Sequence, residues 1–340
     1  MRDLFLLVDY KGQFWCPHRP GYSFPDPDRM GAVFADRGWR LRILRFSEVD
    51  LRTQDYRDQV VLYQSSQDFG LHYKGYLEDV LLAMQVQGAR LVPDFHLLRA
   101  HHNKVFMELL RDLSPVPEVR SLRARHFGTL EDLERHLDEL EFPLVLKRAD
   151  TDCGRGVALA RDRREARRAA ARLMRTANLR NTWQNLEKTV LLPGWVPHSS
   201  HRAKLVVQPF IPGLDSDYKA LVFGPKIYVL LRPTRPGDFR ASGAGGNRTY
   251  PQELPDGLLD FVERVFQAFR SPFASIDVMH DGQRYYLGEI QFVRFGTTTL
   301  LGSPHHFRRG ADGAWTRVEG RDQWDEVFAT CVADYLEAPA

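Results

Sequence analysis

Four short apolar segments alternate with helical patterns in the first hundred residues, and this alternation limits the fold more than any other feature. The apolar segments are Leu4–Val8, Trp39–Leu44, Val60–Tyr63 and Arg90–Pro93. The helical patterns between them are Asp28–Arg37 and Leu77–Val86. Strands and helices at this spacing predict a small parallel α/β domain. Ligands of open parallel sheets bind beyond the carboxyl ends of the strands, so we expect binding near Tyr10–Cys16 and Gln64–Tyr73.

The remainder of the chain has hairpins around single helices, which predicts antiparallel α+β structure. We expect a helix at Asn103–Arg111 with Val105, Leu109 and Leu110 inward, a helix at Thr129–Leu140 capped by Thr129, and little regular structure in Thr176–Ala203. We expect a hairpin at 218–232, a helix at 258–269 and a second hairpin at 274–290. The predicted parts are therefore an N-terminal α/β domain (1–100), a central subdomain (101–203) and a C-terminal subdomain (204–340).

Composition excludes several classes of protein. Apolar residues make up 43% of the 340, and 47 basic residues nearly balance 44 acidic ones, leaving a net charge of +3. Nucleic-acid binding proteins usually concentrate basic residues on one face, and the one dense stretch, Arg161–Arg175, fits a solvated helix face. No apolar stretch approaches the roughly 18 residues of a membrane span. We therefore expect a cytoplasmic protein without nucleic-acid or membrane partners, and a homodimer is compatible with the sequence.

Three oxygen-bearing side chains occur in the last predicted hairpin. Asp277 interrupts an apolar strand, while Glu289 and Gln291 share one face of the next strand because side chains alternate. A half-buried carboxylate costs free energy unless it is paired or bound to a metal. Two carboxylates and an amide oxygen suit Mg²⁺. The structural alternative is an ion pair of a carboxylate with Arg284 or Arg294.

The hairpin register decides whether these side chains can meet. A two-residue turn at Asp281-Gly282 pairs Asp277 with Tyr286 and puts the two carboxylates on opposite faces. An odd-numbered loop, or a β-bulge, puts them on the same face. A metal site therefore requires an odd loop or a bulge.

Other candidates are cationic or rich in glycine. Lys147 ends a buried strand just before a loop with Gly154 and Gly156, which suits phosphate binding, although the spacing is not that of a P-loop. The segment from Gln208 to Gly213 follows another buried strand and can hold a purine edge, or it can be a plain strand exit. Arg232 and Arg240 suit an anionic intermediate.

The order of these features, more than any one of them, resembles the ATP-grasp superfamily over about residues 100–300. The similarity is strongest to the branch of ribosomal-protein glutamate ligase and glutathione synthetase. It implies an ATP-grasp fold of α/β plus α+β type, with an N-terminal parallel α/β domain preceding the nucleotide-binding module, and the cofactors ATP and Mg²⁺.

The resemblance also implies roles for individual residues. ATP phosphates are assigned to Lys104 and Lys147, with Lys219 close by. The flap over the phosphates corresponds to Asp152–Val157, including Asp152, Gly154 and Gly156. The adenine and ribose positions are Gln208, Phe210, Ile211 and either Asp215 or Asp217. The transferred phosphoryl group is assigned to Arg232 and Arg240, and magnesium to Asp277, Glu289 and Gln291.

Three positions depart from the family pattern. Gln291 stands where asparagine is usual, Pro209 where the adenine segment usually has an acidic residue, and Ser242 where the ligase branch commonly has asparagine. The first change keeps an amide oxygen, and the other two affect nucleotide and substrate details.

The implied activity is ATP-dependent carboxylate–amine ligation through an acyl-phosphate, with a small-molecule, amino-acid or peptide substrate. The alternatives are a kinase-like ATP-grasp phosphotransferase and a non-catalytic nucleotide-binding scaffold.

Overall fold

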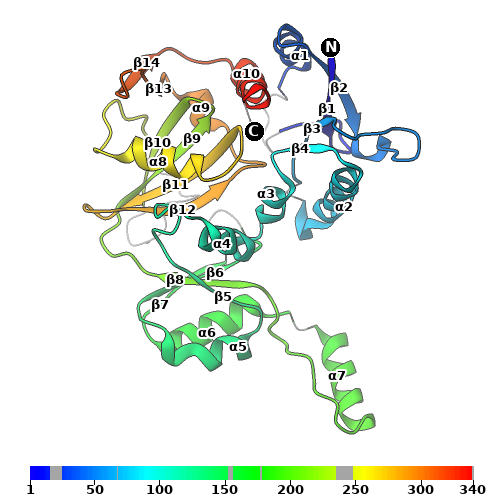
Figure 1. The fold of residues 1–340 in the computed structure, drawn as a ribbon. Helices are drawn as coiled ribbons and strands as arrows, with labels where there is room; N and C mark the ends of the chain where they lie inside the picture. Colours follow the sequence, from blue (N-terminus) through cyan, green and yellow to red (C-terminus); the bar gives the residue numbers. More distant parts are fainter. Residues whose placement is uncertain (16–24, 67, 152–155, 177, 235–247, 339–340) are drawn as a thin grey trace.

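Three β-sheets, each with its own helices, make up the computed structural model of the protein (Figure 1). It describes residues 1–15, 25–66, 68–151, 156–176, 178–234 and 248–338. Short 3-10 helices occur at Phe46–Glu48, Phe69–Leu71 and Leu137–Glu139.

The N-terminal sheet is parallel and has helices on both faces. Its strands, in the order β2-β1-β3-β4, are β1 (Arg2–Val8), β2 (Trp39–Arg45), β3 (Val60–Leu62) and β4 (Arg90–Val92). Because side chains alternate along β1, Leu4 and Leu6 pack in one cluster with helix α1 (Pro27–Asp36), and Phe5 and Leu7 pack in another with α2 (His72–Gln87). The predicted parallel α/β domain is confirmed.

Helix α3 (Phe95–Ala100) and helix α4 (Lys104–Leu113) lead to the second sheet. Our prediction for the inward face of α4 is correct for Leu110, which packs against the hydrophobic core, and wrong for Leu109, which is 37% exposed. Val105 is half-buried, and the fully buried residues are Met107, Glu108 and Arg111.

The buried charges of α4 explain the error. The Arg111 guanidinium forms an ion pair of 2.9 Å with Glu108 and donates to the carbonyl oxygens of Val119, Leu122 and Leu287. A charge can be buried when an opposite charge and hydrogen bonds satisfy it. One of these partners, Leu287, lies 176 residues away, and two others lie beyond the end of the helix, so the helical pattern alone assigns Arg111 to the surface.

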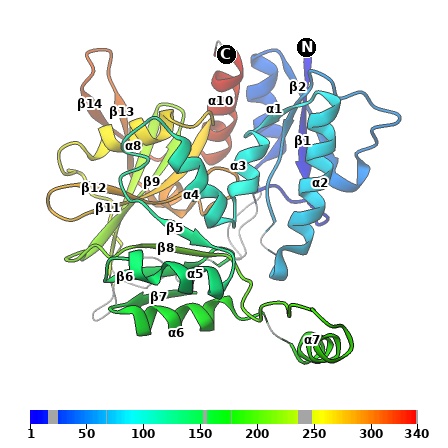
Figure 2. The ribbon, with the colours of Figure 1, turned by 60° about the horizontal axis from the view of Figure 1, so that its bottom comes forward.

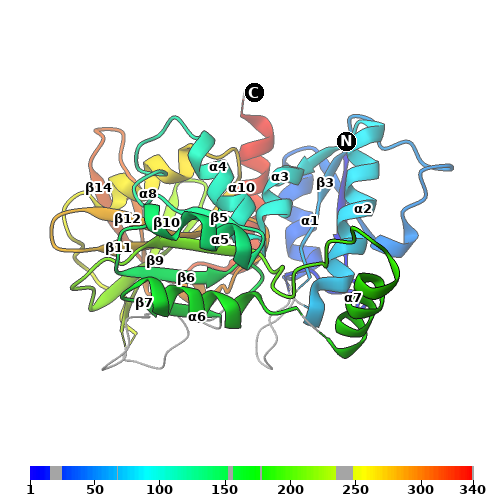
Figure 3. The same cartoon turned by 90° about the horizontal axis from the view of Figure 1, so that it is seen from below.

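The central sheet is antiparallel, in the order β5-β8-β6-β7. Its strands are β5 (Arg125–Phe127), β6 (Leu144–Arg148), β7 (Val157–Ala160) and β8 (Leu205–Pro209). Helices α5 (Leu130–His136) and α6 (Arg163–Met174) cover one face, seen from below in Figure 3. The Thr129 hydroxyl caps α5 by accepting from the Asp132 amide at 3.1 Å, as predicted.

Helix α7 (Leu179–Leu191) lies in the segment for which we predicted little regular structure, and that prediction is wrong. The Asn178 side chain caps it by accepting from the Asn181 amide at 2.8 Å. None of its described side chains is buried; Leu179 is 92% and Trp183 is 68% exposed. Among the described residues none covers the apolar side chains of α7 enough to bury them, and the helix stands away from the three sheets (Figure 1).

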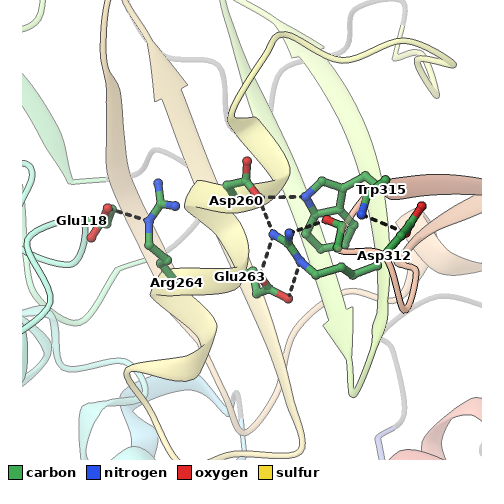
Figure 4. Close-up of polar contacts among 9 residues, drawn as sticks. Glu118, Asp260, Glu263, Arg264, Asp312 and Trp315 are labelled. Atoms are coloured by element: carbon green, nitrogen blue, oxygen red, sulfur yellow. Dashed lines mark hydrogen bonds and ion pairs between the residues drawn. The ribbon is translucent and has the colours of Figure 1, made fainter.

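The C-terminal sheet has six strands in the order β12-β11-β9-β10-β13-β14. They are β9 (Ser216–Phe223), β10 (Lys226–Pro233), β11 (Phe273–His280), β12 (Tyr285–Gln291), β13 (His305–Arg309) and β14 (Trp315–Glu319). Helix α8 (Leu258–Gln267) packs on one face, and its Asp260 and Glu263 form ion pairs with Arg309 of β13 (Figure 4). Asp260 also accepts from the Trp315 indole at 2.9 Å, and Arg264 pairs with Glu118 at 2.6 Å (Figure 4).

The opposite face of this sheet contacts α9 (Thr298–Gly302) and α10 (Trp324–Glu337). Helix α10 also packs on α1, so the first and last parts of the chain share one hydrophobic cluster. The division at residues 100/101 and 203/204 stays a proposal. In the described part of the chain, no helix combines the length and apolarity that crossing a membrane requires.

We predict that Arg111→Met lowers the free energy of unfolding by about 3–5 kcal/mol, because it leaves Glu108 buried and unpaired. Urea unfolding measures the change, and Arg123→Met, on an exposed loop residue, is the control. The double variant Arg111→Met/Glu108→Gln should recover part of the loss. A loss below about 1 kcal/mol in the single variant would contradict this role of the ion pair.

Candidate active site

Four charged side chains form one network on the face of the C-terminal sheet opposite α8. The Arg232 guanidinium donates two hydrogen bonds of 2.6 Å to Asp217, and one of its nitrogens lies 2.8 Å from Asp277. The Lys219 ammonium lies 3.3 Å from Asp277 and donates to the Ser275 hydroxyl at 2.6 Å. Asp277 therefore pairs with Arg232 and Lys219. Within the residues that the structure describes, it does not pair with Arg284 or Arg294, the two arginines considered as partners in the sequence analysis.

Strand alternation explains why these groups meet. On β11, Ala274, Ile276 and Val278 pack in the cluster that contains α8, so Ser275 and Asp277 project to the other face. Antiparallel pairing places Asp277 beside Lys219 of β9, and Asp217 of β9 beside Arg232 of β10.

A β-bulge brings Glu289 opposite Asp277. His280 pairs with Tyr285, so the loop between the strands has an even number of residues, and without a bulge Asp277 would face Gly288. The register shifts after Asp277, and the observed pairs are Asp277 with Glu289 and Ser275 with Gln291. A metal site here required an odd-numbered loop or a β-bulge in the hairpin, and the structure has a bulge.

Gly288 provides the space for this bulge. A Cβ atom at this position would lie 3.1 Å from the Asp277 carbonyl oxygen, closer than nearly all such contacts. A side chain here would therefore require the Asp277 backbone to shift by a few tenths of an ångström.

Burial and charge act on these carboxyl groups in opposite directions. Burial raises the pKa of Asp277, but Arg232 and Lys219 outweigh it and hold that pKa at about 2. Burial is the larger effect at Asp217, whose pKa is raised although Arg232 opposes the shift. Asp277 therefore stays ionised near neutral pH, and its charge is shared by two cations.

Lys147 lies on the face of the central sheet that α5 and α6 leave uncovered. Leu144 and Leu146 pack against those helices, so Val145 and Lys147 project the other way. Burial lowers the pKa of Lys147, while Glu289 and Glu108 act to raise it. The central sheet lies next to β11 and β12 in Figures 1 and 2. Glu289 is close enough to the Lys147 ammonium to act on its pKa.

Lys104 and Gly156 lie at the end of β6. The Lys104 backbone N–H donates to Ala149 at 3.3 Å, and its ammonium contacts the Thr151 carbonyl oxygen. Gly156 has a φ of 68°, and a Cβ atom there would lie 2.6 Å from the Thr151 hydroxyl, so the position favours glycine. Asp152, Gly154, Arg240 and Ser242 lie outside the described residues.

The predicted adenine segment follows β8. Gln208 is buried and pairs with Val145 on the face that carries Lys147. The Phe210 N–H already donates to the Pro143 carbonyl at 3.0 Å, which leaves Ile211 as the better candidate for a backbone contact to the base. Asp215 is exposed, whereas Asp217 is buried against Arg232, so Asp215 is the better ribose candidate.

Sequence reasoning missed Ser275 and the contact of Asp217 with Arg232. Ser275 sits two residues before Asp277 in an apolar strand, so it shares the face of Asp277, and this spacing was the available clue. Only the pairing of β9 with β10 shows that Asp217 faces Arg232.

We predict that the difference in free energy of unfolding between wild type and Asp277→Asn, the stability gap, becomes smaller as the pH falls from about 4 to 2. A carboxyl with a lowered folded pKa stabilises the fold above its unfolded pKa of about 3.9, and this contribution, about 2 kcal/mol, is lost on protonation. Urea unfolding at several pH values measures the gap, with the exposed Asp256→Asn as control. An equal gap at pH 6 and pH 2.5 would contradict the charge network.

Comparison with known proteins identifies the fold. A RimK domain ATP-grasp protein from Sphaerobacter thermophilus has 16% identity and a TM-score of 0.51, over 99% of this chain and 100% of that one. D-cycloserine synthetase DcsG has 13% identity and a TM-score of 0.53, over 98% and 100%. A RiPP-associated ATP-grasp ligase from Chryseobacterium gregarium, in complex with ADP and a leader and core peptide, has 10% identity and a TM-score of 0.53, over 100% and 98%.

No curated protein matches the chain. Residues 102–294 match the family model described as a RimK-like ATP-grasp domain, which is more than half of the chain. The ATP-grasp fold expected from the sequence is confirmed, and so, at the level of the family, is the expectation of an ATP-dependent ligase-type enzyme. The protein belongs to the RimK-like ATP-grasp family.

Proposed function

We propose that the protein is a Mg-ATP-dependent carboxylate–amine ligase that works between the central and C-terminal sheets. The observation that carries the proposal is the bulge that sets Asp277 opposite Glu289, with Arg232, Lys219 and Lys147 around them. Two carboxylates among three cations can hold a metal–polyphosphate complex, because the metal takes the carboxylates while the cations meet phosphate oxygens.

In this proposal ATP lies along the open face of the central sheet. Gln208 and Ile211 hold the adenine end, and Asp215 faces the ribose. Lys147 and Lys104 bind phosphate oxygens near the end of β6, and Lys219 binds them from the opposite sheet. Arg232, held in a fixed orientation by Asp217, faces the transferred phosphoryl group. Asp152, Gly154 and Arg240 keep the roles proposed from the resemblance.

The donor set suits magnesium. Asp277, Glu289 and Gln291 offer only oxygen atoms, the ligands that Mg²⁺ prefers. Pairing in β11 and β12 puts Asp277 directly opposite Glu289 and Ser275 opposite Gln291, on one face. Among the described residues no group of three or more His, Cys, Asp or Glu side chains forms a metal site, so the amide of Gln291 and the nucleotide itself are needed to complete this one. Bound magnesium would neutralise phosphate charge.

The reaction would proceed in two steps. A substrate carboxylate oxygen attacks the γ-phosphorus of ATP, ADP leaves, and an acyl-phosphate forms. The amine then attacks the acyl carbon, the amide bond forms, and inorganic phosphate and a proton leave. The residues of this chain contribute position and charge: Arg232 and the lysines stabilise phosphoryl oxygens, and the sheets hold both reactants close together.

Two of the fold relatives support the proposed substrate class. One relative is titled a D-cycloserine synthetase, and another was solved with a leader and core peptide. A small molecule, an amino acid or a peptide therefore remains the proposed substrate, and a homodimer in the cytoplasm is the proposed setting.

Product analysis separates this function from its alternatives. ADP with a stoichiometric amide supports the ligase, a phosphorylated product without an amide supports the kinase-like phosphotransferase, and nucleotide binding without turnover supports a scaffold. The most informative assay screens amino acids, peptides and sugar acids for ADP release with Mg-ATP.

We predict that Lys147→Met weakens ATP binding by about 1.5–3 kcal/mol, because a charge-assisted contact to phosphate is lost. Calorimetric titration measures the dissociation constant. Lys188→Met, on the exposed helix α7, is the matched control and should bind ATP like the wild type. An unchanged dissociation constant in Lys147→Met would remove this lysine from the nucleotide site.

We predict that Glu289→Gln weakens ATP binding in the presence of Mg²⁺ by tenfold or more, with little change when Mg²⁺ is absent. Glu289 is exposed, so its loss should leave the melting temperature within a few degrees of wild type. Glu326→Gln, on the exposed side of α10, is the control. Equal weakening with and without Mg²⁺ would argue against a metal ligand at this position.

A further inference from the structure

A cavity of about 400 Å³ lies where the N-terminal domain meets the central sheet. Helix α2, the turn between α3 and α4, and the residues just after β6 and just before β8 enclose it. Its volume falls within the range of small-ligand pockets, about 300–1,000 Å³. The charged residues that line it are Lys74, Glu78, Arg99, Arg148, Asp150, Arg202 and Lys204.

Cations outnumber carboxylates in this lining by five to two. Lys74 is buried, with 5% of its side chain exposed, and pairs with Glu78. Glu78 also accepts from Arg99 at 3.0 Å, so a single carboxylate serves two cations. Lys204 donates to the neutral amide oxygen of Asn103 at 3.2 Å. This part of the cavity therefore has excess positive charge.

The electrostatics of Lys74 agree with this geometry. Burial lowers its pKa, Glu78 acts to raise it, and Arg99 and Lys204 lower it further. Holding three cations this close costs free energy that an incoming anion would remove.

The cavity is separate from the proposed nucleotide positions but adjoins them. Neither Lys147, Gln208 nor Lys219 lines it. Ala149 and Asp150 do line it, and the Ala149 carbonyl accepts from the backbone N–H of Lys104, a proposed phosphate ligand. A group bound in the cavity would therefore lie close to the phosphate end of the nucleotide.

We propose that this cavity binds a carboxylate group of the substrate through Arg99 and Lys204. The inference rests on the proposed ligase function, which requires a carboxylic acid. The proposed ligase function selects a carboxylate over a phosphate; the charges do not, because a lining with five cations and two carboxylates attracts either anion.

The test is calorimetric titration with tricarballylate, a small molecule with three carboxylates, compared with its uncharged triamide and with pyrophosphate. We expect tricarballylate to bind the wild type, and the triamide not to bind. Arg99→Gln and Lys204→Gln should each weaken tricarballylate binding about tenfold or more, the effect of losing one charge-assisted hydrogen bond. Both side chains are partly or fully exposed, and an unchanged melting temperature checks the fold.

Two control variants separate the cavity from the nucleotide site. Arg168→Gln removes an exposed arginine of α6 that does not line the cavity, and should leave tricarballylate binding unchanged. Lys147→Met should weaken ATP binding but not tricarballylate binding. If the wild type fails to bind ATP while tricarballylate still depends on Arg99 and Lys204, the cavity is supported and the ligase function is overturned.

Three results would overturn the cavity proposal. The first is tricarballylate binding that is unchanged in both Arg99→Gln and Lys204→Gln. The second is equal binding of the triamide. The third is binding of pyrophosphate alone that depends on Arg99 and Lys204, because this would assign the cavity to phosphate.

Discussion

The ion-pair network around Asp277 is the interaction on which the rest of the site depends. A carboxylate buried in a strand is tolerated only because Arg232 and Lys219 reach it from neighbouring strands. Asp217 holds Arg232 in turn with two short hydrogen bonds. The apolar half of the same sheet face packs against α9 and α10, and this packing holds the strands in place. The charged half is therefore oriented before any ligand binds.

The two sheets contribute different parts of the proposed chemistry. The C-terminal sheet supplies carboxylates for a metal and cations for phosphoryl oxygens, and the central sheet supplies Lys147 and the adenine segment. Arg111 of α4 links the connection that leads to the central sheet with β12 of the C-terminal sheet, because it donates to carbonyls of Val119 and Leu287. The cavity beside Arg99 and Lys204 extends this arrangement toward the N-terminal domain.

Periodicity in the sequence was sufficient to predict the strands that carry the site and the face of Asp277, because side-chain direction in a strand depends on local alternation. It did not predict strands β5, β13 and β14. It was insufficient for Arg111, whose burial depends on carbonyls up to 176 residues away. From the sequence, a bulge was one of two ways to bring Asp277 and Glu289 to the same face, the other being an odd-numbered loop. The sequence could not decide between them, because a glycine in a strand does not by itself specify a register. Helix α7 was missed because none of its described side chains is buried, so it has no core-facing stripe for periodicity to reveal.

A crystal structure of the protein with Mg²⁺ and a non-hydrolysable ATP analogue tests the central claim most directly. The account predicts a metal about 2.0–2.1 Å from oxygens of Asp277 and Glu289, with the phosphates between Lys147 and Lys219. A nucleotide bound away from these lysines, or a metal without contact to either carboxylate, would contradict it.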